Sequence, residues 1–224
     1  NGIERSIAER IVKQLAAFAS YGFPESHAAS FALLVYASAY LRRHFAPEFY
    51  AALLDAQPMG FYPVGTIVAD ARRHGVEVRA PDVLASSWLS TLEPAERPSA
   101  FAPYALRLGL SMIHGLGPEA RTKLEEGLVR RPFDSIEDFA TKTSLAPPSL
   151  RAIAEAGAFD SLARDRRRAL WEVLRIEKRP VGPFDRRAPD PHTPMLPGLS
   201  EAEATIADYA TTGVSAPHMP RTNR

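Results

Sequence analysis

The sequence predicts a mainly α-helical fold with a small β insertion, and three observations support this. Apolar residues recur at spacings of three and four along the first twenty positions, the period of an amphipathic helix. Proline or glycine then bounds most of the later apolar segments, as it does at helix ends. Alternation of apolar residues with charged or small ones, which is typical of a half-buried strand, is confined to the short segments 76–79 and 105–110.

In the first half of the chain we expect four helices. Pro24 and Glu25 favour a first helical turn, and Gly75 marks a helix end. The segment Ser86–Ala102 is rich in Ser, Pro and Glu, so we expect a loop there. The predicted helices are Ile3–Ser20, Glu25–His44, Pro47–Leu54 and Val64–His74.

From Ser111 onward the pattern predicts short helices joined by tight turns, at 118–129, 135–143, 148–156 and from Arg164 to about 177. Six prolines between positions 180 and 197 predict a linker or disorder. Ser200 followed by Glu203 is the pattern of a capping box, which predicts a last short helix at 200–209. We expect the final residues to fray.

Composition limits the possible classes of protein. A chain of 224 residues with 46% hydrophobic content can bury one good core or two small ones. Arg42, Arg43 and His44 end the longest apolar run, so no membrane span is expected. The absence of cysteine excludes disulfides and thiolate metal sites and suits a cytoplasmic protein. The first residues lack both a Met and a signal peptide, which we interpret as an internal cut.

A basic segment lies between Arg164 and Arg187, where nine basic residues face four acidic ones. Such an excess supplies a sequence-independent attraction to phosphate, and we name Arg166, Arg167 and Arg168 as candidate DNA-binding residues. The alternative is a solvated helix face.

Polar groups are threaded through the apolar helix predicted at 25–44. They are Ser26, His27, Ser30, Tyr36, Ser38 and Tyr40. Hydroxyls and an imidazole in such a run need partners. Either the fold supplies these partners internally, or a ligand does so at the mouth of a cleft.

The segment LSMIHGLGPEARTKLEEGL, from Leu110 to Leu128, resembles a helix-hairpin-helix motif. Two glycines allow a sharp turn and a close approach to phosphate, and the amides of the following helix point at the anion. The candidate DNA-binding residues are His114, Gly115, Leu116, Gly117, Arg121 and Lys123. The alternative is an ordinary helical turn. A second unit at 145–162 turns through Ala146-Pro147-Pro148 instead of glycines, so we expect it to be mostly structural.

A longer resemblance covers residues 1 to about 185, and more weakly 208–220. The segments YGFPESHAASFALLVYASAYLRRHFAPEFYAALLDAQPMGFY, DARRHGVEVRAPDV and LRLGLSMIHGLGPEAR resemble the bacterial C-family DNA polymerases, the alpha subunit of DNA polymerase III, and particularly the error-prone branch. The resemblance implies a late fingers region at 1–102, a helix-hairpin-helix domain at 103–179, and a Pro-rich linker with the start of a truncated region at 180–224.

The resemblance also implies a division of labour. In this family, palm carboxylates hold two Mg²⁺ ions that align the 3′-hydroxyl with the incoming triphosphate. That palm lies upstream, and Asp55, Asp70 and Asp82 are isolated on different predicted elements. We therefore expect no catalytic or metal-binding residue in this chain, and Mg²⁺ only for the full-length polymerase.

The fingers would grip the incoming dNTP, and we name Ser26, His27, Tyr36 and Tyr40 for that role. The alternative is that His27 caps its helix and Tyr36 is core. Expected partners are primer–template DNA and the dNTP, with a sliding clamp or accessory mutagenesis proteins as further candidates, in damage-tolerant synthesis. A different hypothesis is a non-catalytic helical protein-interaction module of a replication or repair assembly. An independent enzyme activity has little support, because the six histidines are scattered.

Overall fold

The chain is mainly helical in the computed structural model, which describes residues 4–20, 25–163, 165–177 and 197–215. This confirms the predicted fold class. Two compact units are distinguished, 1–44 and 45–224, and each is described by itself. The predicted boundary between residues 102 and 103 stays a prediction.

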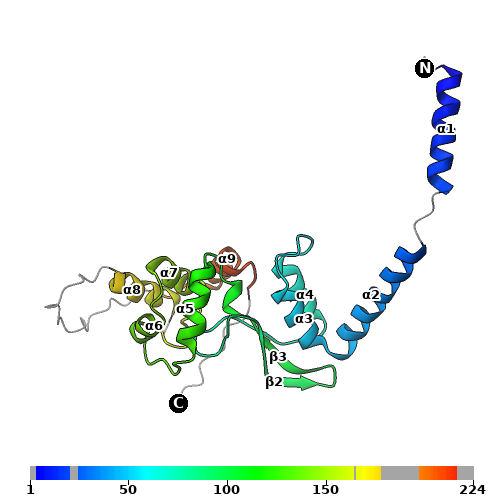
Figure 1. The fold of residues 1–224 in the computed structure, drawn as a ribbon. Coiled ribbons are helices and arrows are strands. Elements are labelled where there is room, and N and C mark those ends of the chain that lie inside the picture. Colours follow the sequence, from blue (N-terminus) through cyan, green and yellow to red (C-terminus); the bar gives the residue numbers. More distant parts are fainter. Residues whose placement is uncertain (1–3, 21–24, 164, 178–196, 216–224) are drawn as a thin grey trace. The chain divides into compact units, whose positions relative to one another are not determined.

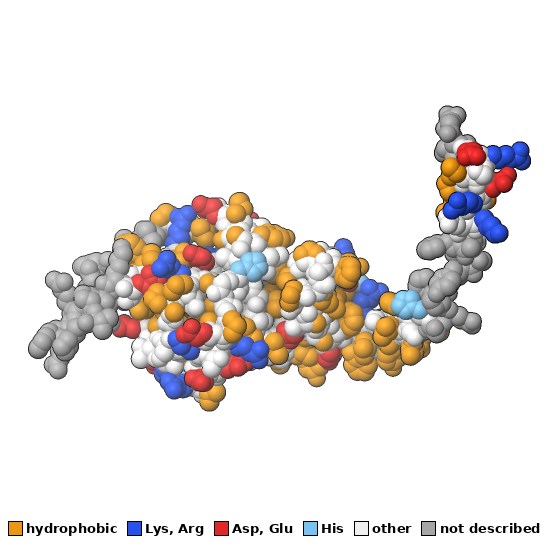
Figure 2. Space-filling view, turned by 45° about the horizontal axis from the view of Figure 1, so that its top comes forward, with side chains coloured by type: hydrophobic (Ala, Val, Ile, Leu, Met, Phe, Trp, Pro, Cys, Tyr) orange, Lys and Arg blue, Asp and Glu red, His pale blue; other side chains and the backbone are white. Residues whose placement is uncertain are grey.

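The first unit consists of two helices, α1 (Arg5–Ser20) and α2 (Glu25–His44), close to the predicted bounds. Apolar side chains of α2 lie exposed, among them Leu33 and Val35, which are 69% and 65% exposed. Hydrophobic side chains accordingly gather over this helix in the space-filling view (Figure 2). An apolar surface of this kind is ordinarily covered in a folded protein.

In the second unit, two helices and a small sheet share a core. The helices are α3 (Ala46–Asp55), which begins with Pro47 in its first turn, and α4 (Val64–Arg73), which ends before Gly75. Tyr50, Leu54 and Val68 from these helices pack in one apolar cluster with Leu106 and Leu108. The fourth helix was predicted to end at His74, and α4 ends one residue earlier, at Arg73.

The sheet has the order β1-β3-β2, formed by β1 (Val78–Arg79), β2 (Thr91–Ser99) and β3 (Ala102–Arg107). β1 pairs with β3 in parallel, as Val78 lies opposite Leu106, and β2 pairs with β3 antiparallel. The expectation of a loop throughout 86–102 was wrong, because β2 occupies much of it. Pro94 and Pro98 are tolerated since β2 is an edge strand.

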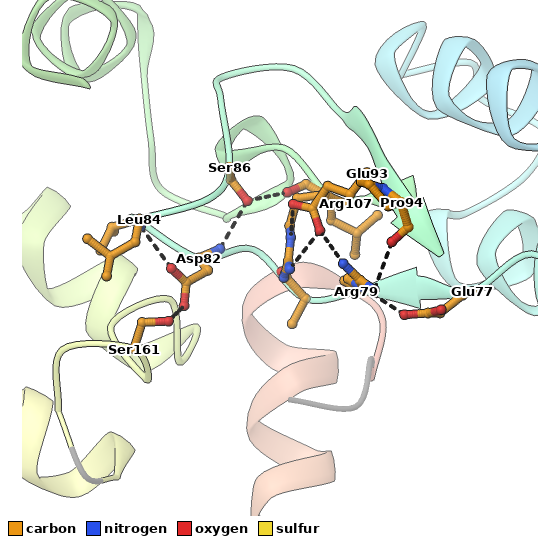
Figure 3. Close-up of polar contacts among 12 residues, drawn as sticks. Glu77, Arg79, Asp82, Leu84, Ser86, Glu93, Pro94, Arg107 and Ser161 are labelled. Atoms are coloured by element: carbon orange, nitrogen blue, oxygen red, sulfur yellow. Dashed lines mark hydrogen bonds and ion pairs between the residues drawn. The ribbon is translucent and has the colours of Figure 1, made fainter. Parts of the chain in front are cut away.

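An ion-pair network fastens β2 to the rest of the sheet (Figure 3). The Glu93 carboxylate accepts from Arg79 Nη1 at 2.6 Å and from Arg107 Nε at 2.8 Å. Arg79 Nε also donates to Glu77, and Arg107 Nη1 donates to the carbonyl of Ala80 at 2.7 Å. Both guanidinium groups are buried yet fully engaged, so they cross-link all three strands instead of facing a ligand.

A second core lies under the short helices. These follow a 3-10 turn at Leu110–Met112 and are α5 (Pro118–Leu128), α6 (Ile136–Thr143), α7 (Pro147–Glu155) and α8 (Arg166–Glu177). Phe133, Phe139 and Phe159 stack edge to face within it, with ring centroids 5.0 and 5.1 Å apart. Ser135 caps α6 by accepting from the amide of Asp138.

The last described helix is α9 (Glu201–Thr212), three residues longer than predicted at its C-terminal end. The predicted capping box is confirmed, since Ser200 and Glu203 exchange both hydrogen bonds. Figure 1 shows α9 between the group α5–α8 and the pair α3–α4. The predicted linker at 180–197 falls almost wholly outside the described residues. The final residues, which we expected to fray, lie outside them from residue 216 onward, while Val214 is buried in a core. Among the described helices, none is long and apolar enough to cross a membrane.

Candidate nucleic-acid interface

The turn between the 3-10 segment and α5 has the geometry of a hairpin. Gly115 adopts φ +89°, a left-handed conformation that favours glycine. Gly117 is different, since its φ of −87° and ψ of −178° are open to any residue, and a Cβ there would meet nothing within 4 Å. Gly117 is therefore not required by the protein's own backbone or packing, whereas a close approach by a ligand would require it.

Several amides of this hairpin are available to a ligand. Among the described residues, the amides of Gly115, Gly117 and Glu119 have no protein acceptor. Gly115 and Gly117 are exposed and Leu116 is half-buried. Pro118 has no amide, and Arg121 already donates to Gly117. The amides thus sit at the positive end of α5, an arrangement that suits an anion.

His114 precedes these amides and is held by α9. Its backbone amide donates to the carbonyl of Thr211 at 2.8 Å, and its Nδ1 lies 3.1 Å from the carbonyl of Ala210. The backbone amide and Nδ1 of His114 therefore already have partners within the protein.

Arg121 and Lys123 lie one turn along α5, each in an exposed ion pair. Arg121 Nε is 2.9 Å from Glu125 and its guanidinium lies over the Trp88 ring, while Lys123 Nζ is 2.8 Å from Glu119. The hydrogen bond and charge of Lys123 hold the pKa of Glu119 below its usual range. Exposed pairs of this kind are weak, so both cations can exchange a carboxylate for a phosphate.

The charge around the hairpin is mixed. On the face shown in Figure 2, Lys and Arg side chains of the 45–224 unit are interspersed with Asp and Glu. Backbone amides and a few nearby cations therefore have to supply any grip on phosphate, in place of a broad basic surface.

The second hairpin-like segment, at 145–162, differs from the first at the N-terminus of its helix, α7. Its first two residues, Pro147 and Pro148, lack amides, and the amides of Ser149 and Leu150 already donate to Ala146. Leu150 and Ile153 are buried in the core. This geometry favours the structural role expected from the sequence.

The three candidate arginines of α8 are placed differently. Arg166 is 6% exposed and pairs with Asp208 of α9, which favours a structural role over contact with phosphate. Arg167 bonds Glu203 and the carbonyl of Pro197. Arg168 pairs with Glu172 on its own helix, with 40% of its side chain exposed.

The candidate nucleotide-gripping residues belong to the 1–44 unit, and the hairpin residues belong to the 45–224 unit. The His27 ring packs edge to face on Phe31, with centroids 4.5 Å apart, and Tyr40 packs on His44. Tyr36 is 70% exposed, so within this chain it is not a core residue. The side chain of Ser26 lies outside the described part.

Metal binding finds no support in the described residues. They include no group of three His, Asp or Glu side chains placed to hold a metal ion. Asp70 is instead bonded to Tyr50 and Arg73, Asp82 caps a turn and binds Ser161, and Asp55 accepts from the amide of Ser90. These carboxylates do not fit a shared Mg²⁺ site.

Two contacts around the hairpin region were not foreseen. Arg131 donates to the carbonyls of Val83 and Ser86, and α9 supplies the acceptors for His114. Neither has a sequence signal, because a backbone carbonyl is present at every residue. Of these features, the sequence predicted only the capping box at the start of α9.

Residues 75–169 match the family model described as "Helix-hairpin-helix motif", which includes the hairpin and α5–α7. The match supports a helix-hairpin-helix motif in this part of the chain.

The resemblance to error-prone polymerases is confirmed over nearly the whole chain. It is 47% identical over 222 residues to the error-prone DNA polymerase of Anaeromyxobacter sp. (strain K), which covers 98% of this chain and 20% of that protein. The corresponding enzymes of Burkholderia mallei and Pseudomonas syringae pv. tomato are 43% and 42% identical over 98% and 97% of this chain. The chain spans about a fifth of the length of these relatives.

Proposed function

We propose that this chain is the part of an error-prone DNA-directed DNA polymerase that holds the DNA duplex through the hairpin at 114–117 and the N-terminus of α5. The observation that carries the proposal is the set of exposed hairpin amides without a protein acceptor among the described residues. A phosphate oxygen is the ligand that such amides at a helix start bind best. The similarity to polymerases that bear this name supports the choice of DNA.

In this role the hairpin reads no sequence. Amide contacts to phosphate position the duplex, and Arg121 and Lys123 add charge next to them. Template-directed synthesis, including its Mg²⁺ ions, would be carried out by the four fifths of the polymerase that this chain does not contain. We propose contact with the incoming nucleotide for four residues of α2, namely Ser26, His27, Tyr36 and Tyr40.

The test is duplex binding followed by fluorescence anisotropy across a range of salt concentrations. For a few phosphate contacts, the logarithm of affinity falls with the logarithm of salt concentration, by about 0.9 for each contact. Gly117→Ala adds a methyl group that the protein tolerates but that blocks a close phosphate, so weaker binding is expected. Gly198→Ala is the matched control, since a Cβ there also meets nothing within 4 Å.

Lys123→Ala checks the charge contribution separately. It should weaken binding and reduce the salt slope by about one unit, the value for a single lost phosphate contact. Unchanged binding in both Gly117→Ala and Lys123→Ala would show that DNA does not use the hairpin.

A protein-interaction role is favoured by one observation, the exposed apolar side chains of α2. We propose that they pack against another segment of the longer polymerase, because the chain spans only about a fifth of the length of its relatives. Replacing Leu33 and Val35 by Ser should abolish such a contact without affecting duplex binding by the hairpin. Co-purification with the missing polymerase segments measures the first effect, and anisotropy the second.

A further inference from the structure

We infer that α9 with residues 213–215 is a strap that positions the DNA-binding hairpin, and that His114 and Arg166 act on DNA through this strap instead of touching phosphate. The inference rests on the proposed function of the hairpin. It assigns a role to a segment that follows the predicted linker and that neither the hairpin nor the polymerase resemblance explains.

The strap meets the hairpin at His114. The last four carbonyls of a helix lack partners within the helix, and those of Ala210 and Thr211 in α9 accept from His114 Nδ1 and from its backbone amide. Because a carbonyl only accepts, Nδ1 must carry the proton. His114 thus satisfies two carbonyls at the negative end of α9 and fixes the residue immediately before the free amides.

The strap is anchored to α8 by a buried ion pair. Arg166 and Asp208 are each 6% exposed, and Arg166 also donates to the carbonyls of Ala156 and Ala204 at 3.4 Å. The second oxygen of Asp208 accepts from Ser215 at 3.0 Å. This places α9 on the helical core that carries α5, so the anchor and the hairpin share one support.

The far end of the strap is held by α4. Arg72 donates to the carbonyl of Ser215 at 2.7 Å, and Val214 is buried in the core formed by α3, α4 and the sheet. A Cβ on Gly65 would lie 2.8 Å from the carbonyl of Gly213, closer than a side chain can approach. The strap is therefore fixed by both cores, and the hairpin is fixed by the strap.

The decisive experiment compares two neutral replacements of His114. The amide nitrogen of Asn takes the place of Nδ1, whereas that of Gln takes the place of Nε2. If His114 positions the hairpin, H114N retains duplex affinity and H114Q loses about fivefold, the factor for one hydrogen bond. If His114 instead contacts phosphate through Nε2, the order is reversed. Equal affinity of H114N, H114Q and the unaltered chain overturns the inference but leaves the proposed function standing.

Gly65→Ala supplies an independent test, because Gly65 lies on α4 and outside the hairpin. The added methyl group displaces Gly213 and hence the end of α9, so duplex binding should weaken with no change in charge. Gly198→Ala is again the control.

Amide hydrogen exchange without DNA gives a further readout, and residues 113–120 should exchange faster in H114Q and Gly65→Ala than in H114N. Unchanged exchange in both variants refutes the strap, while failure of the unaltered chain to bind duplex refutes the proposed function alone.

Discussion

Neighbouring arginines of α8 illustrate how strongly burial decides what a charged residue does. Arg166 is buried against Asp208, while Arg168, two positions on, pairs with Glu172 and keeps 40% of its side chain exposed. Removing one partner of a buried pair leaves an uncompensated charge, whereas an exposed pair is already solvated.

We therefore expect Arg166→Ala to lower the free energy of unfolding by about 3–5 kcal/mol and Arg168→Ala by less than about 1 kcal/mol. Urea unfolding followed by circular dichroism measures both. Equal losses would show that the Arg166–Asp208 pair is as solvated as its neighbour.

Glu93 gives a pH dependence with a defined sign. Burial raises the pKa of Glu93, but hydrogen bonds from Arg107 and Arg79 outweigh this, so the pKa lies below its ordinary value of 4.5. A carboxylate with a lowered pKa stabilises the fold above its unfolded pKa and loses this contribution as the pH falls.

The Glu93→Gln variant should accordingly melt at a lower temperature than the unaltered chain near pH 7. The gap should stay constant down to about pH 5 and narrow as the pH falls below the unfolded pKa and through the lowered folded pKa of Glu93. Thermal melts at a series of pH values test this, and a gap that does not change with pH would contradict it.

At the scale of elements, α5 and α6 pack closely because Gly127 lacks a side chain. A Cβ on Gly127 would lie 2.5 Å from Thr143 Cγ2 and 2.8 Å from its Cα. Alanine in an exposed helix stabilises relative to glycine by about 0.5–1 kcal/mol, but here the clash dominates. We expect Gly127→Ala to destabilise the protein by about 1–3 kcal/mol, the usual cost of overpacking. Urea midpoints measure it, and a gain in stability would mean that the helices are less closely packed.

The helices were largely predictable, and the strand β2 was not, for one physical reason. Helix ends follow from Pro, Gly and capping residues, which act locally, so α2 was predicted to the residue and α4 to within one. In β2 the usual pattern is inverted, since Glu93 faces inward to meet two arginines while Leu92 faces outward. A charged residue on the inner face has no signal until its partners are known.

The candidate site was predictable to the same degree. The glycines and the start of α5 predict the hairpin from sequence alone, and the structure has a left-handed Gly115 and a helix that begins at Pro118. That these residues bind DNA stays a prediction. The sequence could not show which candidate arginines are buried in ion pairs. The burial and pairing of Arg166 depend on Asp208, in a helix about forty residues further along the chain.

For the whole molecule, two cores and a short sheet support one proposed DNA contact, in a chain that spans about a fifth of its relatives. The carboxylates of the described residues hold turns and ion pairs in place, and they do not form a metal site.

We therefore predict that the purified chain does not extend a primer in the presence of Mg²⁺ and all four dNTPs, while still binding the duplex. A gel-based extension assay, with a complete error-prone polymerase as the positive control, measures this. Extension by the chain alone would show that it holds catalytic carboxylates.

The strap also bears on how such polymerases can be dissected. A shortened protein that stops at residue 179, the expected edge of the helix-hairpin-helix domain, would keep every candidate DNA-contacting residue and still lose Asp208, Thr211 and Val214. Arg166 would then lose its counter-charge, and the core formed by α3, α4 and the sheet would lose Val214. A truncated protein should therefore end beyond residue 215, although the proline-rich segment before α9 resembles a domain boundary.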